Sequence, residues 1–497
     1  MNNVIIVGAG IAGITAGVYA LQSGFDVTIL EQHTIPGGFC TSWKRGGYLF
    51  EGGLHWLTGS SDKQPLYKVW RNIGAINDSI KVFTSDPSMV YDHNGQQINF
   101  YRDVKKLKTH LLDFAPEDKK EINNLCNIIR AYSKLAMPIS DIKGVKVKNK
   151  SRMKLSALIS MLPAFMKMVK YWKITMNEYA ERFKNPVLRS FFGDTTDEGY
   201  SAAMLFFPLG LYAAGDGGYL EGGSLKMAQN MADRVKSLGG KIQYRTKVEQ
   251  VIIENGKAIG VLVNGEKLIA DSVIVTVDTL AAMDNLFPKS HSEPWFDKMR
   301  TMTDRLAINT FISIGIEADL SDLPGHITFS LDTPFEFAGT KHDAIGCGNY
   351  AAFKDYAPKG CTAMTVILNG DTYDFWKIHK ENGTYEDEKK KIADTVIAIL
   401  SEKIPQIKDK VAVIDVATPL TYERYCGSYR GSWMTMMGKG KRDKAFPLKS
   451  VTAQNLYYAG QRMQPPGGMP PAADTGRRAV QYLCKDAGVV FQGKMKE

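Results

Sequence analysis

The sequence contains few cysteines and no long apolar run. Its 497 residues include six scattered cysteines without C-x-x-C spacing, which argues against a disulfide framework or a zinc site and is typical of a reducing compartment. No segment approaches the roughly 20 apolar residues that cross a bilayer. The uncharged stretch from Val4 to Leu21 is interrupted by glycines and lacks the basic start of a signal peptide. We expect a cytoplasmic protein, with peripheral attachment to the inner face of the membrane as an alternative.

Motifs of hydrolytic and metal-dependent catalysis are also missing. The chain has no G-x-S-x-G nucleophile elbow, no H-E-x-x-H helix and no cluster of metal-ligating residue types. Its apolar share of 44% and charged share of 23% are ordinary for a soluble globular protein. Because a chain of this length exceeds what one hydrophobic core usually serves, we expect at least two lobes and no metal site.

The clearest positive signal is a dinucleotide fingerprint near the N-terminus. Gly8, Gly10 and Gly13 form G-x-G-x-x-G between the apolar run VIIV and a helical stretch, and Glu31 ends the following strand, DVTILE. The first glycine allows a tight turn, the second lets the backbone approach a pyrophosphate, and the third lets the helix pack on the strand. The helix N-terminus attracts negative charge, and the acidic residue binds ribose hydroxyls. This βαβ unit predicts a Rossmann-like fold for FAD or NAD.

Later patterns alternate between strands and helices. The stretch SMVYDHNGQQINFYR (88–102) predicts a hairpin that turns at Asn94-Gly95. Residues 103–189 are mainly helical in pattern, and residues 240–278 predict a meander of three short strands followed by the buried run VIVTV. The chain therefore returns to a sheet after a long excursion.

Several blocks carry a specific family resemblance. The order GAGIAG, ILEQ, PGG and GGYLFEGGLHWL resembles the FAD-containing phytoene desaturase family, particularly its carotenoid isomerase and retinol saturase branches. The blocks YLEGGSLKMAQNMA, TPLTYERYCGSYRGS and NLYYAGQRMQPPGGMPPAADTGRRAV extend the match through the middle and the C-terminal part. The match is weakest from about residue 103 to 200.

The resemblance implies an α/β fold with two interleaved domains. One is a Rossmann-like FAD-binding domain of the glutathione-reductase type, formed by the separated segments 1–80, 215–280 and 445–497. The other is an α+β substrate-binding domain formed by segments 81–214 and 281–444.

The resemblance also implies which residues hold FAD. Gly8, Gly10, Gly13 and Glu31 would bind the ADP half, with the pyrophosphate near Gly37-Gly38. The remaining contacts would come from Val248 at the adenine, and from Gly460, Gln461, Gly467, Gly468 and Met469 along the ribityl chain and flavin ring.

Two positions depart from the family pattern. Phe39 stands where many relatives carry a basic residue, and Gln461 stands where an acidic residue commonly binds the ribityl hydroxyls. We expect Lys44 or Arg45 to supply the missing charge, and Gln461 to bind through its amide. The proline-rich stretch QPPGGMPPAAD (464–474) is then a strand-to-helix turn, whose helix begins at the flavin.

Only one dinucleotide fingerprint is present, because the glycines at 215–223 lack a preceding strand. A separate nicotinamide domain is therefore not expected. NAD(P)H would reduce the flavin transiently at its open face, unless another donor serves.

His55 lies in the block GGLHWL, which the resemblance places near the flavin. A histidine there suits an acid or a hydrogen-bond donor, because its ordinary pKa lies near the working pH. The alternative is a packed histidine satisfied by the backbone. We expect Glu51 to belong to the scaffold of the same strand and turn.

A basic segment (142–177) contains no acidic residue. Nearly all of the +10 net charge is concentrated in its nine basic residues: Lys143, Lys146, Lys148, Lys150, Arg152, Lys154, Lys167, Lys170 and Lys173. The run LSALISMLPAFMKMVKYW, with lysines at helical spacing, predicts contact with an anionic membrane surface. A solvated helix face with a buried stripe is the alternative, and no motif supports binding of nucleic acid.

The resemblance implies an FAD-dependent oxidoreductase that acts on carbon–carbon double bonds of a lipophilic isoprenoid or polyene. Desaturation, saturation and a redox-neutral cis–trans isomerisation with reduced flavin remain open. The alternatives are an amine-oxidase-like flavoenzyme and a non-catalytic lipid-binding protein. The expected partner in the main interpretation is an apolar small molecule.

Overall fold

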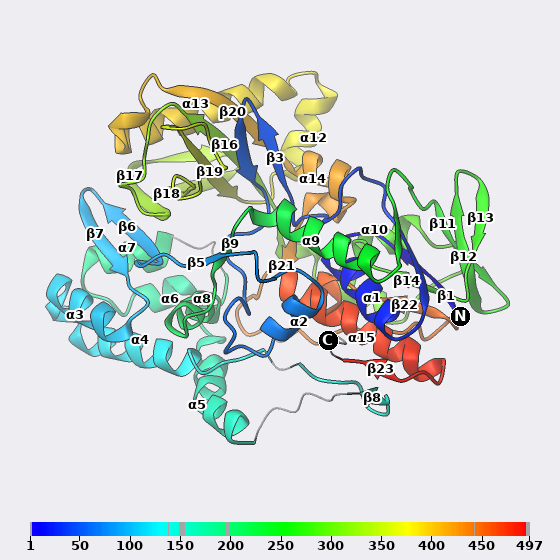
Figure 1. Ribbon diagram of the computed structural model, residues 1–497. Coiled ribbons are helices and arrows are strands. Elements are labelled where there is room, and N and C mark those ends of the chain that lie inside the picture. The colour runs from blue at the N-terminus through cyan, green and yellow to red at the C-terminus, as the bar shows by residue number, and fades with distance from the viewer. Residues whose placement is uncertain (1, 138, 149–154, 195–198, 442, 494–497) are drawn as a thin grey trace.

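The computed structural model describes residues 2–137, 139–148, 155–194, 199–441 and 443–493. It contains a lobe built on a parallel sheet, a second lobe built on a mixed sheet, and a group of helices beside the second lobe (Figure 1). Among the helices of these residues, none has the length and apolar character that a membrane span requires.

The first lobe is organised around a parallel sheet. Its strands in spatial order are β10 (Lys241–Gln243), β2 (Asp26–Leu30), β1 (Asn3–Val7), β14 (Ser272–Val275) and β22 (Leu456–Tyr458). The apolar run VIIV places β1 in the middle of the sheet, where both faces are covered. Because the strands come from three distant parts of the chain, the sheet forms only when both chain ends meet.

Side chains of this sheet alternate between two cores, as the period of a strand requires. Val4 and Ile6 face one core, and Ile5 and Val7 face the other. The helices over the first core are α1 (Ile11–Gln22), α9 (Gly223–Ser237) and α15 (Met469–Asp486). The elements over the second core are β11 (Gln250–Glu254), β12 (Lys257–Val263), β13 (Glu266–Ile269), α10 (Thr279–Asn285) and α11 (Phe296–Arg300).

The predicted three-stranded meander is confirmed by β11, β12 and β13, which pair antiparallel. Its turns fall at Asn255-Gly256 and Asn264-Gly265, where positive φ angles favour these residue types. The second core continues past residue 280, because Ala282, Met299 and Met302 pack into it. The division of the chain into two domains, with a boundary at 280, stays a prediction.

The second lobe contains a mixed sheet whose strands come from two parts of the chain. In spatial order they are β20 (Val411–Ala417), β16 (Asn309–Ile316), β19 (Thr362–Asn369), β18 (Thr340–Asn349), β17 (His326–Phe337), β6 (Met89–His93) and β7 (Gln96–Phe100). The predicted hairpin of residues 88–102 is confirmed by β6 and β7. Helices α12 (Tyr373–Glu381) and α13 (Tyr385–Lys403) pack on this sheet.

A hairpin from the N-terminal part of the chain crosses to the second lobe. It consists of β3 (Ser42–Arg45) and β4 (Tyr48–Glu51). Trp43 donates from Nε1 to Asp415 in β20 over 3.1 Å, and Arg45 pairs with the same carboxylate over 2.9 Å. This hairpin therefore joins the two lobes beside the site.

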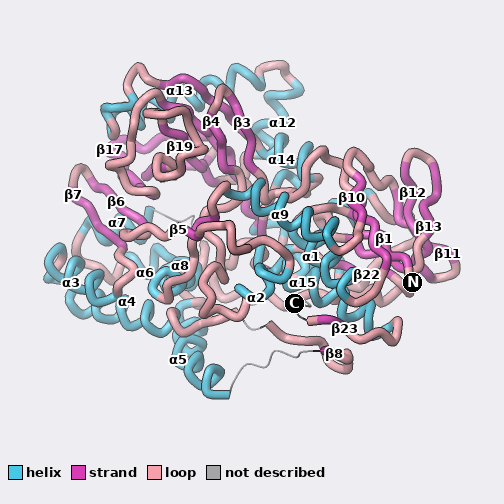
Figure 2. Tube along the Cα trace, viewed as in Figure 1, coloured by secondary structure: helices cyan, strands magenta, loops and turns pink. Residues whose placement is uncertain are grey.

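The helical group has an aromatic core of its own. Its helices are α3 (Val104–Phe114), α4 (Lys119–Tyr132), α5 (Leu155–Tyr171), α6 (Met176–Ala180), α7 (Pro186–Asp194) and α8 (Ala203–Ala213). Tyr132, Tyr179 and Phe206 are buried among them. The helical pattern predicted for residues 103–189 is confirmed at α3 to α7, whereas residues 139–148 contain the strand β8 (Val147–Lys148) and no helix, and residues 138 and 149–154 lie outside the described part of the chain. Figure 2 shows these helices beside β6 and β7, whose Tyr91, Ile98 and Phe100 pack into the same core.

Candidate cofactor and substrate site

A cavity of about 940 Å³ lies at the carboxyl ends of β1, β2, β14 and β22. The chain passes from β1 to β2 on one side and later adds β14 on the other side of β1. The cavity thus lies where the strand order reverses, which is the usual ligand position in open parallel sheets. Its volume is at the upper end of the roughly 300–1,000 Å³ typical of small-molecule sites.

The three glycines of the fingerprint occupy different environments. Gly8 directly follows β1 and has a φ of +100°, a conformation that favours glycine. A Cβ on Gly10 would meet only Gly37 O, at 4.0 Å, because this position faces the cavity. A Cβ on Gly13 would lie 1.9 Å from Gly8 O, so the close contact of α1 with β1 requires glycine there. Gly13 does not line the cavity.

Two helices begin at the cavity wall. Ile11 and Ala12 of α1 and Met469 of α15 line it, together with Gly468 just before α15. Neither helix has an acidic residue in its first turn or a side-chain cap. Both positive N-terminal ends therefore remain uncompensated, which suits an anionic ligand such as a pyrophosphate.

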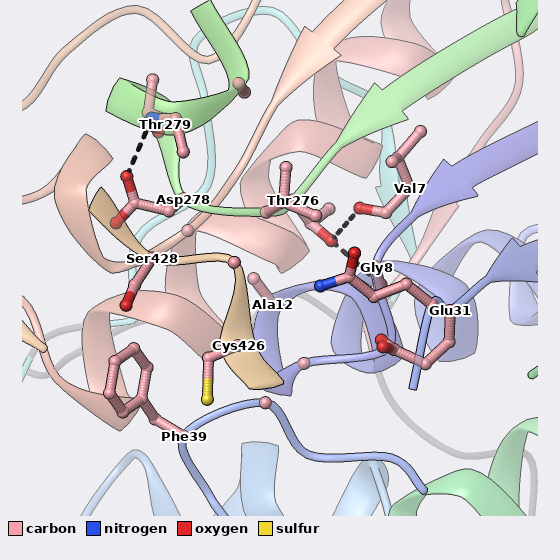
Figure 3. Close-up of a pocket in the computed structure, with 18 of the residues that line it drawn as sticks. Val7, Gly8, Ala12, Glu31, Phe39, Thr276, Asp278, Thr279, Cys426 and Ser428 are labelled. Atoms are coloured by element: carbon pink, nitrogen blue, oxygen red, sulfur yellow. Dashed lines mark hydrogen bonds between the residues drawn. The ribbon is translucent and has the colours of Figure 1, made fainter. Parts of the chain in front are cut away.

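Glu31, directly after β2, lines this cavity. Its Oε2 accepts from Ala9 N over 2.7 Å, and its Oε1 accepts from His33 N over 2.8 Å. Each carboxylate oxygen has a further lone pair for a hydroxyl. Figure 3 shows Glu31 on one side of the cavity and Phe39 and Ser428 on the other.

The remaining predicted residues are brought together from distant segments. Val248 lines the cavity, and its N–H and C=O hydrogen-bond no other described residue, so both are free for an adenine edge. Gly37-Gly38 packs against the start of α1, where Gly37 N donates to Ala9 O over 2.9 Å. Gly460 and Gln461 line the cavity after β22, whereas Gly467 does not reach the cavity wall.

The expectation that Lys44 or Arg45 supplies a positive charge to the cofactor is wrong. Neither lines the cavity, because the β3–β4 hairpin carries both to the second lobe, where Arg45 pairs with Asp415. The cavity instead contains Lys247 and Arg424.

A third cation of the cavity, Arg462, is buried. Its Nε donates to Asp278 over 2.5 Å and its Nη2 to Ser432 O over 3.2 Å, while its Nη1 has no partner among the described residues. Ser428 Oγ is also buried at the cavity wall without such a partner. Sequence reasoning missed both residues. Two features of the sequence could have indicated them. Arg462 follows Gly460 by two residues, and Ser428 lies in the block TPLTYERYCGSYRGS.

These features fit FAD. The cavity offers open faces at Gly10 and Gly38, two helix N-termini, the Glu31 carboxylate and three cations, which match a ligand with a pyrophosphate and a ribose. The unpartnered atoms of Arg462 and Ser428 supply further donors for its polar edges. The assignment of individual residues to parts of FAD stays a prediction.

A row of aromatic rings in stacked, tilted and edge-to-face contacts leads away from this cavity. From the cavity wall outward the rings are Phe39, Tyr422, Phe311, His55, Trp56 and Tyr212, with successive centroids 5.5, 5.5, 6.2, 6.4 and 6.1 Å apart. We call this set the aromatic path. It draws on β16, α8 and α14 (Pro419–Cys426) and on the loop after β4, so both lobes and the helical group contribute.

His55 lies on the aromatic path and does not line the cofactor cavity. Its side chain is accessible to solvent, yet desolvation by the surrounding protein lowers its pKa to about 4. Desolvation and the nearby charge of His55 also lower the pKa of His326 to about 4. Because the charge of His55 acts on His326, the two rings lie close together at the start of β17, and we call the solvent-accessible space beside them the recess.

The expectation that His55 titrates near the working pH is wrong, because desolvation keeps its ring neutral there. The alternative, in which backbone groups hydrogen-bond the His55 ring, also differs from the structure. Within the described part of the chain, the His55 ring forms no hydrogen bond. The ring therefore offers one N–H donor and one acceptor to whatever enters the recess.

Glu51 is a scaffold residue, as predicted. It is fully buried, and Oε1 accepts from Gly53 N and Leu54 N over 3.0 and 3.1 Å. Oε2 accepts from Ser224 N over 3.0 Å and from Tyr219 Oη over 2.6 Å. These bonds fix the loop that carries His55 against α9.

Three proteins of similar sequence have names that describe enzymes of polyenes or retinoids. The chloroplastic prolycopene isomerase of Daucus carota is 23% identical over 98% of this chain and 80% of its own length. The 4,4'-diapophytoene desaturase of a Methylomonas species is 24% identical over 99% and 97%. The all-trans-retinol 13,14-reductase of Danio rerio is 22% identical over 92% and 82%. The predicted resemblance to the phytoene desaturase family is confirmed.

Solved structures confirm the predicted fold class. Cyclohexylamine oxidase from Brevibacterium oxydans superimposes with a TM-score of 0.60, at 14% identity, over 98% of this chain and 99% of its own. An oxidoreductase from Methanosarcina mazei gives 0.58 at 18% identity, over 96% and 100%. The family model for flavin-containing amine oxidoreductase matches residues 11–484, nearly the whole chain. The protein therefore belongs to the flavin-containing amine oxidoreductase family.

Proposed function

We propose that this protein uses FAD to desaturate, saturate or isomerise carbon–carbon double bonds of an apolar polyene or isoprenoid. The observation that carries the proposal is the aromatic path, which runs from the wall of the cofactor cavity at Phe39 to the recess at His55. Two of its five ring contacts are stacked, one is tilted and two are edge-to-face. A conjugated chain would pack beside these rings, because aromatic faces stack on extended π-systems.

The electrostatics of the recess support an uncharged substrate. The low pKa values of His55 and His326 leave both rings neutral at neutral pH. The nearby carboxylate of Glu51 is occupied by two backbone N–H groups of its own loop, by Ser224 N and by Tyr219. An ammonium group would find no free carboxylate among these residues, so they offer no counter-ion to an amine.

The names of the similar proteins point to the same substrate class. They include an isomerase, a desaturase and a reductase of polyenes or retinoids. Because these differ in the direction of the redox change, the proposal covers desaturation, saturation and redox-neutral isomerisation.

FAD, when bound, supplies hydride acceptance and donation at its N5 atom. The residues of the chain bind and orient the reactants. The N-termini of α1 and α15 line the cavity and would stabilise negative charge on a bound pyrophosphate and flavin, and the aromatic path would exclude water from the substrate. NAD(P)H, approaching transiently, is the proposed reductant for the saturating and isomerising versions.

The test is anaerobic flavin spectroscopy of the purified holoprotein. Oxidised enzyme is mixed with an acyclic carotenoid precursor or with an alkylamine, and enzyme treated with NADPH or NADH is mixed with a conjugated polyene. We expect flavin bleaching by the precursor, or reoxidation by the polyene, with a product of changed hydrogen content. Isomerisation would give a geometric isomer without net NAD(P)H consumption.

Two results would overturn the proposal. Bleaching by alkylamines but by no polyene would favour an amine oxidase. A protein that retains polyene but takes up no FAD on reconstitution would favour a lipid-binding function.

A further inference from the structure

Helix α5 presents an apolar stripe to solvent. The stripe consists of Leu158, Ile159, Leu162, Phe165, Met166 and Val169, whose exposed fractions lie between 40% and 67%. Neighbouring members of the stripe are one, three or four residues apart in the sequence, which places all six on one face of the helix. A contiguous exposed stripe of this kind marks an interaction surface rather than ordinary solvated helix.

The opposite face of α5 holds the helix in place. Met161, Ala164 and Tyr171 are buried in the core of the helical group. Tyr171 Oη accepts from Asn124 Nδ2 in α4 over 2.9 Å, and its carbonyl oxygen accepts from Ser201 Oγ over 3.1 Å. The stripe is therefore displayed on an anchored helix, and α5 lies at the lower edge of the molecule (Figure 1).

Positive charge flanks the C-terminal half of the stripe. Lys167, Lys170 and Lys173 follow one another at helical spacing and form no ion pair with another described residue. Lys146-Val147-Lys148 contributes further charge from β8 (Val147–Lys148), which lies at the same edge (Figure 1). Lys150, Arg152 and Lys154 fall outside the described residues.

We infer that α5 docks this protein on the surface of an anionic lipid bilayer, with the helix axis in the plane of the interface. The apolar stripe enters the boundary between headgroups and acyl chains, and the lysines contact anionic headgroups. A second copy of this chain is a poorer occupant, because a two-fold pair of stripes would bring the lysines of both copies together. The inference is independent of the proposed function, since it requires neither FAD nor a particular substrate.

The test is flotation of the full-length holoprotein with vesicles of phosphatidylcholine containing roughly one third phosphatidylserine, at about 0.15 M salt. Ile159→Ser/Met166→Ser removes exposed stripe residues without opening the core. The matched control is Ile269→Ser/Val451→Ser, because these residues are 60% and 62% exposed but lie in the first lobe. A Lys170→Ser/Lys173→Ser variant tests the charge.

We expect wild type and control to float alike. The stripe variant should lose at least about tenfold in vesicle partitioning, which corresponds to ~1.4 kcal/mol. Each lysine removed should cost about fivefold, and vesicles of phosphatidylcholine alone should bind weakly.

Three results would overturn the inference. They are absence of wild-type flotation, equal flotation of the stripe variant, or an equal loss in the Ile269→Ser/Val451→Ser control. A fourth contrary result would come from sedimentation velocity without lipid. If wild type is a dimer and the stripe variant a monomer, the stripe binds a second copy of this chain.

Discussion

The side-chain oxygen of Gln461 accepts a hydrogen bond from the backbone N–H of Gly468 over 3.1 Å. This bond closes the proline-rich turn, in which cis Pro465-Pro466 lies between the two bonded residues. Gln461 therefore holds the start of α15 at the cavity wall. The side-chain oxygen of Gln461 thus stabilises the turn. Many members of the phytoene desaturase family carry an acidic residue at this position.

Replacing Gln461 by leucine should weaken FAD binding more than it weakens the fold. The change removes one acceptor worth about 1 kcal/mol, which predicts a roughly fivefold rise in the Kd for FAD. Gln461→Glu keeps an acceptor at the same length and serves as the matched control. Flavin fluorescence titration of apoprotein measures both. Equal affinities for Gln461→Leu and wild type would show that the turn does not depend on this bond.

Gly10→Ala and Gly13→Ala should separate cofactor binding from folding. An added Cβ at Gly10 meets no atom closer than 4.0 Å, so the apoprotein should keep its Tm, while the methyl group enters the space of the pyrophosphate and abolishes FAD retention. At Gly13 the Cβ would lie 1.9 Å from Gly8 O, and we expect a loss of about 1–3 kcal/mol in unfolding free energy. Thermal unfolding of apoproteins and flavin content after purification measure the two effects. Full flavin content in Gly10→Ala would contradict the predicted contact.

The first part of the site could be predicted because it is local in sequence. The turn at Gly8, the open position at Gly10 and the start of α1 all lie within one βαβ unit, whose geometry follows from strand, glycine and helix preferences. The C-terminal half followed only from the family resemblance. Nothing in the composition of residues 464–474 distinguishes a cofactor turn from a linker.

The aromatic path could not be predicted, since it depends on contacts between residues hundreds of positions apart. Phe39, Phe311 and Tyr422 meet only after the β3–β4 hairpin has crossed to the second lobe. The same crossing places Arg45 beside Asp415 in the second lobe, away from the cofactor cavity. The pKa of His55 was also beyond sequence reasoning, because desolvation depends on the walls of the recess and not on neighbouring residues in the chain.

Removing one partner of the buried pair of Arg462 and Asp278 should be strongly destabilising. Both side chains are almost fully buried, and Arg462→Met would leave the Asp278 carboxylate without its cation. A loss of about 3–5 kcal/mol in unfolding free energy is expected. Urea unfolding of apoprotein measures this loss.

The double variant Arg462→Met/Asp278→Asn is the matched control for that change. Asparagine keeps an acceptor for Ala281 N at the start of α10 and removes the unpaired charge, so stability should largely return. If the double variant is no more stable than Arg462→Met, the loss arises from the packing of the arginine side chain and not from the unpaired carboxylate.

The two histidines of the recess should make stability depend on pH between about 6.5 and about 4. Their pKa values in the folded chain are lowered from 6.5 to about 4, chiefly by desolvation. Within this window the unfolded chain takes up protons that the folded chain does not, so the unfolding free energy falls as pH drops and is unaffected by these groups above the window. His55→Gln/His326→Gln should therefore lose less stability than wild type between pH values of about 7 and about 4.5. Urea unfolding across this range measures the difference, with His379→Gln on the outer helix α12 as control. A double variant whose stability falls as steeply as that of wild type would contradict a desolvated histidine pair, because carboxylates elsewhere in the chain would then account for the whole slope.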